Sequence, residues 1–305
     1  YDLVIVIGDI LLGQNKDEAA LREMVAKALV NKGFRLGRLN QSKEAIAVYD
    51  EVVKRFGEAT EPALRERVAK ALVNKGFRLG TLNQSKDEIA VYDEVVKRFG
   101  EATEPALREQ VAMALYNKGF TLGILNQGKE AIAVYDEVVR RFGEVTEPAL
   151  REQVANALFN KGVRLGTLNQ GKEAIAVYDE VVKRFGDATE PALRERVAKA
   201  LVNKGISLLR QEKNAQACQC FSETMGFWEV NQGIVGQLNK VTALSGLQQF
   251  DEAEHLLKQL IEKSAIDPQT AKGFLSDLEL IASAPQPPEG IQEFLARVRE
   301  ILGLK

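Results

Sequence analysis

Apolar residues recur at helical spacing along most of the chain, and the pattern is clearest between residues 60 and 100. Thr60-Glu61-Pro62 supplies a capping hydroxyl, an acid for the positive end of the helix dipole, and a proline suited to a first turn. We therefore predict a first helix over about Ala63–Leu82 and, after the polar turn 83–85, a second over about Lys86–Phe99. Gly100 predicts a left-handed cap that ends the second helix. So short a turn predicts an antiparallel helix hairpin.

The same hairpin returns along the chain, because the phrase Ala-Leu-x-Asn-Lys-Gly occurs five times at a step of 43 residues. A fixed period of this length indicates a solenoid, in which each unit buries its apolar face only by stacking on its neighbours. The five copies begin at Ala28, Ala71, Ala114, Ala157 and Ala200.

The chain on either side of these copies follows the pattern less closely. Tyr1-Asp2-Leu3-Val4-Ile5 looks like the Tyr-Asp-Glu-Val-Val stretch of each second helix. We interpret residues 1–16 as the remnant of a preceding repeat, and the chain as a fragment of a longer protein. Residues 17–228 form five near-identical repeats, 229–264 a divergent sixth, and 265–305 the C-terminal capping helices.

The C-terminal part is still helical in pattern. The fifth repeat predicts a second helix over about Ala215–Met225, and Asp251 opens a helix in the sixth repeat. Asp267-Pro268 predicts the start of a helix that ends near Ser283. Residues 291–302 predict a final amphipathic helix, and divergent end units of this kind are expected to cover a solenoid with a polar face.

Composition excludes several classes of partner. Lys plus Arg (41) nearly balances Asp plus Glu (43), so the net charge of −2 favours neither nucleic acid nor an anionic membrane. No apolar run approaches the ~20 residues that span a bilayer.

Cys218 and Cys220 lie two apart on a predicted helix and point in different directions, which excludes a disulfide framework and fits a reducing cytoplasm. Together with His255 they do not make a metal site, and we expect neither metal nor cofactor.

The repeats resemble the tetratricopeptide repeat (TPR), in which a large residue precedes a glycine by four positions, and an alanine precedes an aromatic by four. Leu29, Gly33, Ala45 and Tyr49 follow this order, as do their counterparts in later repeats. The repeat is a long variant, with 43 residues rather than about 34. Glu88 stands where the second repeat should carry alanine. The resemblance implies an all-α, right-handed superhelical solenoid of stacked antiparallel hairpins, with a concave groove that holds a peptide or partner segment.

The repeats differ most along one stripe of the first helix, at the positions of Lys27, Val30, Phe34 and Arg38. Spacings of three, four and four place these positions on one helical face. The resemblance assigns this face to the groove. The stripe is aromatic and apolar in the middle repeats and basic at the ends, so a bound segment would be favoured by acidic flanks.

Aromatic anchors in an apolar concave patch are a usual source of binding energy. We therefore predict a partner segment anchored at Tyr116, Phe120 and Phe159. The alternative is that Phe120 and its equivalents belong to the core between helices. The predicted groove residues are Lys27, Val30, Asn31, Phe34, Arg38, Lys70, Asn74, Phe77, Met113, Tyr116, Asn117, Phe120, Ile124, Asn156, Phe159, Asn160, Val163, Lys199 and Asn203.

One asparagine recurs in every first helix. A row of side-chain amides can hold an extended peptide backbone, because each amide offers both a donor and an acceptor. Equally, each asparagine could bridge adjacent helices inside the solenoid, since a buried amide needs a partner. The five are Asn31, Asn74, Asn117, Asn160 and Asn203.

Two turns imitate a phosphate-binding loop. Residues 123–129 and 166–172 have the glycine and lysine spacing, but Glu130 and Glu173 follow where a hydroxyl should bind magnesium, and no strand precedes either turn. We interpret both as turns between helices. Acids such as Asp50 recur in each repeat as a solvated face would, and no paired nucleophile and base is recognisable, so we predict no enzyme activity.

The sequence therefore predicts a non-catalytic, cytoplasmic scaffold for protein–protein interaction, which binds a peptide or protein segment and neither nucleic acid nor a membrane. The alternative is a sensor or regulatory repeat arm of a larger multidomain signalling NTPase or other enzyme. Its further domains would precede Tyr1.

Overall fold

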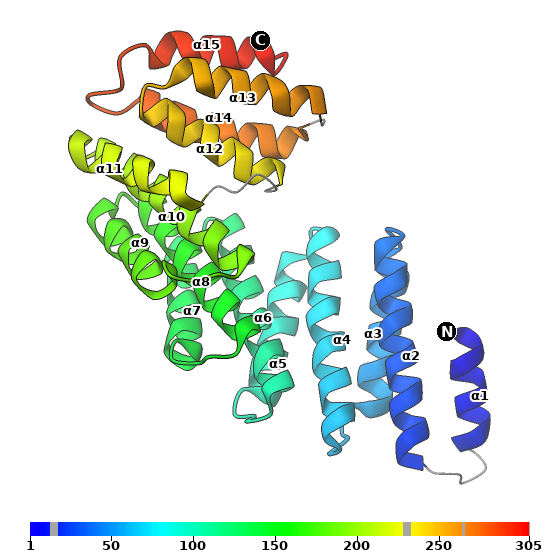
Figure 1. Cartoon of the computed structure of the whole chain (residues 1–305). Helices are drawn as coiled ribbons and strands as arrows, with labels where there is room; N and C mark the ends of the chain where they lie inside the picture. Colours follow the sequence, from blue (N-terminus) through cyan, green and yellow to red (C-terminus); the bar gives the residue numbers. More distant parts are fainter. Residues whose placement is uncertain (13–17, 228–232, 264–265, 305) are drawn as a thin grey trace. The chain divides into compact units, whose positions relative to one another are not determined.

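A computed structural model describes residues 1–12, 18–227, 233–263 and 266–304 of the chain (Figure 1). Within these residues the protein is all-α, with fifteen α-helices, one short 3₁₀ helix and no strand. This confirms the predicted fold class. The chain divides inside one helix into two compact units, Tyr1–Ala157 (unit 1) and Leu158–Lys305 (unit 2), which are described separately below.

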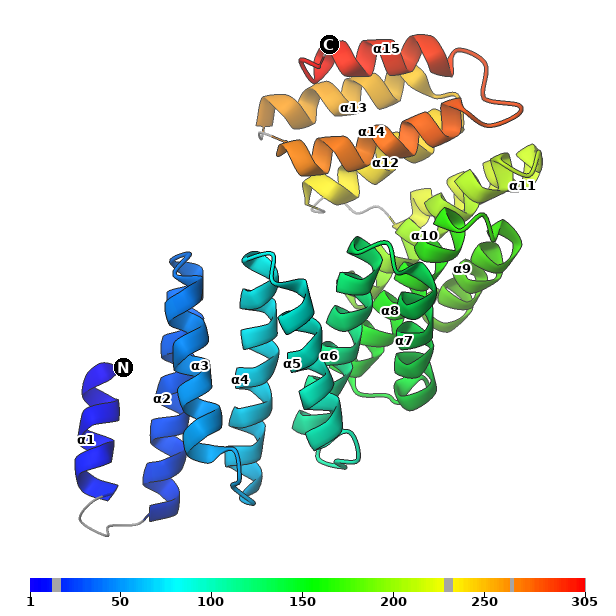
Figure 2. The same cartoon turned by 180° about the vertical axis from the view of Figure 1, so that it is seen from behind.

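Unit 1 is a stack of antiparallel helix hairpins, which lie side by side in both Figures 1 and 2. Each repeat contributes a longer helix A and a 15-residue helix B. Helix A packs against its own helix B, the preceding helix B and the next helix A. The helices are α1 (Asp2–Leu12), α2 (Glu18–Arg38), α3 (Ser42–Phe56), α4 (Pro62–Thr81), α5 (Ser85–Phe99), α6 (Pro105–Ile124), α7 (Gly128–Phe142) and the first half of α8 (Pro148–Thr167).

The starts of the A helices differ from the prediction. The helix bounds themselves agree with the sequence pattern to about one residue, but Thr60 does not cap α4. Glu61 occupies the N-cap position, with Pro62 in the first turn and no side-chain cap hydrogen bond. The Glu61 carboxylate instead accepts a hydrogen bond from Arg22 Nη1 of the preceding helix A at 2.6 Å. This acid therefore joins neighbouring repeats.

The ends of the B helices also differ. Gly100 is not left-handed: its φ and ψ are −60° and −30°, and its N–H still donates to the Val96 carbonyl at 2.9 Å. A Cβ atom there would lie 2.4 Å from the Val96 oxygen, which explains why a glycine is required. The left-handed residue is Asn83, in the turn between helices A and B, where φ is 58°. Asparagine tolerates this conformation better than most residues.

A glycine and a tyrosine bring helices A and B together in each repeat. Tyr92 of α5 is fully buried against Gly76 of α4, where an added Cβ atom would lie 2.5 Å from Tyr92 Cε1. Any side chain at Gly76 would therefore force the two helices apart. The same contact joins Gly33 with Tyr49 and Gly119 with Tyr135.

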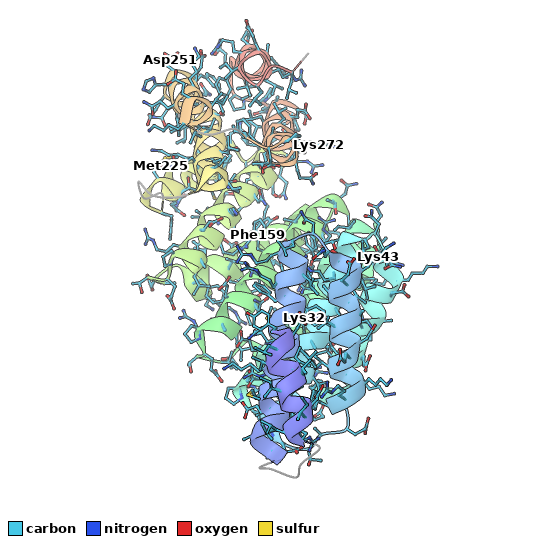
Figure 3. All side chains as sticks on the ribbon, turned by 90° about the vertical axis from the view of Figure 1, so that its right-hand side faces the viewer. Lys32, Lys43, Phe159, Met225, Asp251 and Lys272 are labelled. Carbon is cyan, nitrogen blue, oxygen red and sulfur yellow. The ribbon has the colours of Figure 1, made fainter. Side chains whose placement is uncertain are left out.

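Ion pairs repeat at the surface of unit 1. Lys75 Nζ of helix α4 lies 2.5 Å from Asp50 Oδ1 of the preceding helix B. Lys32 of α2, which is labelled in Figure 3, makes the equivalent ion pair: its Nζ atom lies 2.5 Å from Asp2 Oδ1 of α1. The ion pair between α1 and α2 is therefore the same as the one between a helix B and the helix A of the next repeat. Exposed pairs of this kind each contribute only about 0.2–1 kcal/mol.

Unit 2 combines the end of the repeats with a four-helix C-terminal part. Its helices are the second half of α8, α9 (Gly171–Phe185), α10 (Pro191–Leu209), α11 (Asn214–Thr224), the 3₁₀ helix Met225–Phe227, α12 (Ile234–Gly246), α13 (Phe250–Lys263), α14 (Pro268–Ala282) and α15 (Ile291–Ile301). The helices predicted near residues 215–225, 268–283 and 291–302 are confirmed.

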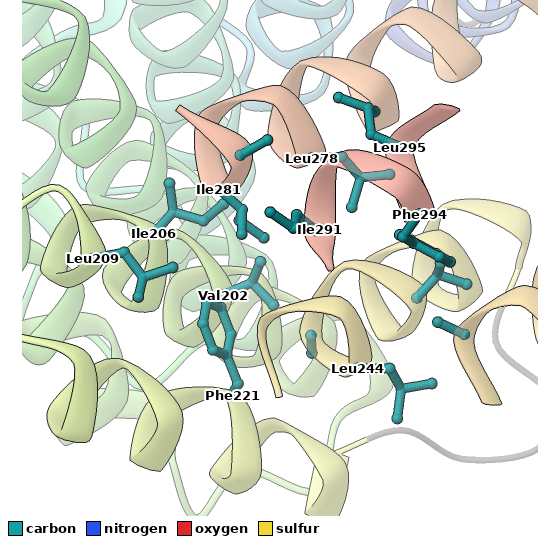
Figure 4. Close-up of a cluster of buried hydrophobic side chains, with 14 of the residues drawn as sticks. Val202, Ile206, Leu209, Phe221, Leu244, Leu278, Ile281, Ile291, Phe294 and Leu295 are labelled. Carbon is teal, nitrogen blue, oxygen red and sulfur yellow. The ribbon is translucent and has the colours of Figure 1, made fainter. Parts of the chain in front are cut away.

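One apolar cluster joins α10 and α11 to the C-terminal helices (Figure 4). Phe221 of α11 takes the place of the repeated tyrosine and is fully buried between Gly205 and Gly246. Val202 and Ile206 of α10 belong to the same buried cluster as Ile281 of α14. The helix A face of the fifth repeat is therefore covered by the chain itself.

The predicted segment boundaries at residues 16, 228 and 264 lie outside the described residues. Among the helices that are described, none is both long enough and apolar enough to cross a membrane.

Candidate functional site

Phenylalanines of the predicted stripe are exposed on three successive A helices of unit 1. Phe34 is 54% exposed, Phe77 53% and Phe120 51%. Ile124, one turn beyond Phe120, is 63% exposed. The alternative that these phenylalanines belong to the core between helices is therefore wrong. We call Phe34, Phe77, Phe120 and Ile124 the aromatic stripe.

The other predicted residues divide by burial. Val30 and Asn156 are buried, at 3% and 9% exposed, so their prediction as partner contacts is wrong. A helix A packed by neighbours on several sides buries part of any wide stripe. Lys27, Asn31, Arg38 and Lys70 are exposed, whereas Asn74, Met113, Tyr116, Asn117, Phe159, Asn160, Val163, Lys199 and Asn203 are half-buried.

The asparagines chiefly bridge repeats. Asn74 of α4 hydrogen-bonds the hydroxyl of Tyr49 in the preceding helix B, and Asn117 of α6 does the same to Tyr92. In unit 2, Asn203 hydrogen-bonds Tyr178. Burial raises the pKa of Tyr49 to about 12, so this phenol stays protonated at neutral pH. For these three asparagines, the structure favours bridging between helices.

A hollow of about 380 Å³ opens beside the aromatic stripe, between the second and third repeats of unit 1. Five of the predicted groove residues line it: Phe77, Tyr116, Asn117, Phe120 and Ile124. The other lining residues were not among the predicted groove residues: Gly80, Thr81, Asn83, Ser85, Glu88, Tyr92 and Thr121. Its volume lies within the range of small-ligand pockets, about 300–1,000 Å³.

Glu88 is the one acidic residue that lines the hollow. Glu88 is only 7% exposed, and the Tyr92 hydroxyl donates a hydrogen bond to Glu88 Oε1 at 3.3 Å. Burial raises the pKa of the Glu88 carboxyl above its usual range, against the opposing effect of hydrogen bonds from Thr121 and Tyr92. Among the described residues, Glu88 forms no ion pair. The site thus holds a nearly buried carboxyl group without a countercharge.

Between the first and second repeats, an arginine occupies the place equivalent to the hollow. Arg78 of α4 donates from Nη1 to the Gly37 carbonyl at 3.0 Å, and its guanidinium carbon lies 4.5 Å from the centre of the Phe77 ring. Ser42 Oγ and Thr81 Oγ1, 3.0 Å apart, form a further polar contact between these repeats.

One repeat later, five of the twelve lining positions have changed. Thr121 stands in place of Arg78, Ile124 in place of Thr81, Glu88 in place of Ala45, Thr81 in place of Arg38 and Tyr116 in place of Val73. A short threonine cannot fill the space that an arginine occupies, so the hollow stays open. The departure of Glu88 from the repeat pattern, together with Thr121 at an arginine position, is the signal in the sequence that could have identified this site.

Phe159, predicted as an anchor, lies in unit 2. Its ring centre is 6.3 Å from that of Tyr178, and the Arg196 guanidinium lies 4.8 Å from it. Lys199, predicted as part of a basic end, is paired with Glu195 at 2.5 Å. Phe159 is thus already stacked by a cation of its own unit, as Phe77 is by Arg78 in unit 1.

No group of three or more metal-ligating side chains occurs in the part of the chain that the structure describes. The two imitations of a phosphate-binding loop are turns between helices, since α7 begins at Gly128 and α9 at Gly171.

Comparison with known proteins gives the fold. No family model matches the chain. No curated protein matches it either. Among solved structures, a tetratricopeptide repeat protein from Parabacteroides merdae matches at 12% identity and a TM-score of 0.53, over 90% of this chain and 98% of that one. The apo form of RapI matches at 13% identity and a TM-score of 0.56, over 92% of this chain and 86% of that one. The pilF protein of Pseudomonas aeruginosa matches at 13% identity and a TM-score of 0.51, over 84% of this chain and 99% of that one. The chain therefore has a TPR-like helical repeat fold.

Proposed function

We propose that the protein is a non-catalytic scaffold that binds an extended segment of a partner protein along the aromatic stripe of unit 1. The exposure of Phe34, Phe77 and Phe120 on three successive A helices is the observation that carries this proposal. Single exposed apolar residues are common, but a regular row of aromatics forms a patch of the kind that marks interaction sites.

The spacing of the stripe suits an extended segment. Neighbouring A helices of unit 1 are in direct contact, and packed helices lie about 8–10 Å apart. A segment in the extended polyproline II conformation advances about 3.1 Å per residue with three residues per turn, so roughly every third side chain would meet the next phenylalanine. The exposed Lys27, Lys70 and Arg38 favour acidic residues beside these contacts.

The proposal includes a cytoplasmic location. Cys218 and Cys220 are both free thiols in the structure, which fits a reducing compartment. The TPR-like fold supports the proposal as a whole, because the family resemblance implies that the A helices line the binding groove.

A displayed library of random peptides tests this function without a known partner. Peptides selected on the intact protein are measured against a triple variant, Phe34→Ala, Phe77→Ala, Phe120→Ala. The matched control changes exposed residues of three B helices, Lys54→Ala, Lys97→Ala and Arg140→Ala. Because all six side chains are exposed, both variants should remain folded, which circular dichroism checks.

We expect the selected peptides to lose about tenfold or more in affinity for the triple variant and to bind the control as they bind the intact protein, since buried aromatic anchors typically contribute 1–2 kcal/mol or more. Equal affinity for both variants would contradict the proposal.

A further inference from the structure

The place equivalent to the hollow, one repeat earlier, shows which chemical group fits there. Between the first and second repeats, the guanidinium of Arg78 contacts the Phe77 ring and donates to the carbonyl of Gly37. An aromatic face and a backbone oxygen together suit a flat cation, because the ring quadrupole attracts positive charge and the carbonyl accepts its hydrogen bond.

Between the second and third repeats the same frame is kept without its cation. Phe120 replaces Phe77 and Gly80 replaces Gly37 at positions 43 residues further on, and both line the hollow. No lysine or arginine lines it. In addition, Glu88 contributes a carboxyl group that the earlier repeat lacks, close enough to Gly80 for an added Cβ atom to lie 2.8 Å from Oε1.

We propose that the hollow receives a basic side chain of the bound segment, with arginine preferred over lysine. The guanidinium would stack on Phe120 and pair with the Glu88 carboxylate. This inference rests on the proposed function, because it names one residue of the segment that unit 1 binds. It places a basic residue at this one position, between flanks that are expected to be acidic.

The energetic reason is the unpaired acid. A carboxylate held almost out of water has lost hydration that no cation of the described chain restores. A partner's arginine would supply that countercharge, with charge-assisted hydrogen bonds that a neutral side chain cannot form. The carboxyl also gives specificity, because an acidic side chain in the same place would meet a like charge.

A small probe tests the hollow independently of any peptide. N-acetyl-arginine amide is titrated into protein with 13C-labelled isoleucine methyl groups, and the Ile124 methyl group, which lines the hollow, is followed by NMR. N-acetyl-citrulline amide serves as the uncharged analogue of the same shape. The variants are Glu88→Gln, which removes the charge and keeps the shape, and Glu130→Gln, which removes an exposed charge on the next helix B.

A probe of about 15 non-hydrogen atoms should bind with a Kd of about 0.5 mM, given about 0.3 kcal/mol per atom. We expect the arginine probe to shift the Ile124 methyl signal, and Glu88→Gln to weaken binding about tenfold, which is the usual effect of a lost charge-assisted hydrogen bond. The citrulline probe should bind the intact protein about as weakly as the arginine probe binds Glu88→Gln. Glu130→Gln should bind the arginine probe as the intact protein does.

A second variant closes the hollow from within. Thr121→Arg restores the arginine of the earlier repeat, so it should abolish the shift of the Ile124 methyl signal and raise the melting temperature by pairing with Glu88. Equal binding of both probes, unchanged binding to Glu88→Gln, or no response to the arginine probe would overturn the proposal. Peptides that need Phe77 and Phe120 but not Glu88 would overturn it while leaving the proposed function intact.

Discussion

A few residues distinguish the hollow from its counterpart in an otherwise uniform stack. Where the first and second repeats meet, the Arg78 guanidinium lies against the Phe77 ring and the Gly37 carbonyl, and Ala45 carries no charge. Where the second and third repeats meet, Thr121 replaces that arginine beside the hollow, and Glu88 adds a nearly buried carboxyl group to its wall. Thr81 and Tyr116 also line the hollow and replace Arg38 and Val73 of the earlier repeats, so five substituted positions on a shared fold separate the two places.

The raised pKa of Glu88 makes a prediction about stability. A carboxyl whose pKa is higher in the folded protein than the unfolded value of 4.5 stabilises the fold only while it is protonated. Its contribution is therefore complete below pH 4.5 and is lost as the pH rises through the folded pKa. Glu88→Gln should raise the melting temperature at pH 7, and this gain should shrink as the pH falls toward 4.5.

Thermal unfolding of both proteins across this pH range measures the difference, and Glu130→Gln again serves as the control. A gain that grows on acidification would show that Glu88 is stabilised as a carboxylate, contrary to the burial described above.

Single residues of the site could be predicted only in part. The predicted stripe includes Phe77, Tyr116 and Phe120, which line the hollow, because unequal residues on equal repeats draw attention to a face. It failed for Val30, which shares that face but is buried. Helical spacing cannot separate exposed from covered positions when three neighbouring helices pack against helix A.

Helices A and B of each repeat owe their close approach to the glycine beside the tyrosine. Gly119→Ala would bring a Cβ atom within 2.6 Å of Tyr135 Cε1, so we expect a loss of roughly 1–3 kcal/mol of unfolding free energy from overpacking. The matched control is Gly273→Ala in the middle of α14, where an added Cβ atom meets open space. That variant should gain about 0.5–1 kcal/mol, because alanine favours a helix over glycine. Chemical denaturation measures both, and equal effects would contradict the contact.

Helix α14 carries a second acid, the half-buried Asp277. Burial raises the pKa of Asp277 to about 6, and its charge acts on Tyr178, whose own pKa is also raised, chiefly by burial. By the same linkage, the contribution of Asp277 to stability is complete below its unfolded pKa of 3.8 and is lost as the pH rises through 6. Asp277→Asn should therefore stabilise the protein at pH 7 by at most about 3 kcal/mol, and much less at pH 4.

Denaturation of both proteins at pH 4 and pH 7 gives this difference directly. An Asp277→Asn variant that is less stable than the intact protein at pH 7 would mean that the carboxylate has a stabilising partner.

Whole helices were far more predictable than their ends. Proline starts and polar turns fixed the bounds of α4 and α5 to about one residue. The caps could not be predicted, because Glu61 binds Arg22 of another repeat and Gly100 is required by a local contact with the Val96 carbonyl. Both caps depend on contacts in three dimensions, and the local sequence pattern does not determine those contacts.

At the scale of the whole molecule, the 43-residue period was enough to predict an all-α stack of hairpins, and the solved structures of similar fold agree. The covering of the fifth repeat by α14 could not be predicted, because the C-terminal helices do not follow the repeat. The stripe is exposed on three A helices of unit 1, and we propose that this surface binds a partner segment.

Photocrosslinking tests that claim most directly. Benzoylphenylalanine is introduced singly at Phe34, Phe77 or Phe120, and for comparison at the exposed positions Lys54, Lys97 and Arg140 of the B helices. After illumination in an extract of the source cells, we expect one common partner to be crosslinked from the three stripe positions and to be absent from the other three. The same adducts from both sets, or none from the stripe, would contradict it.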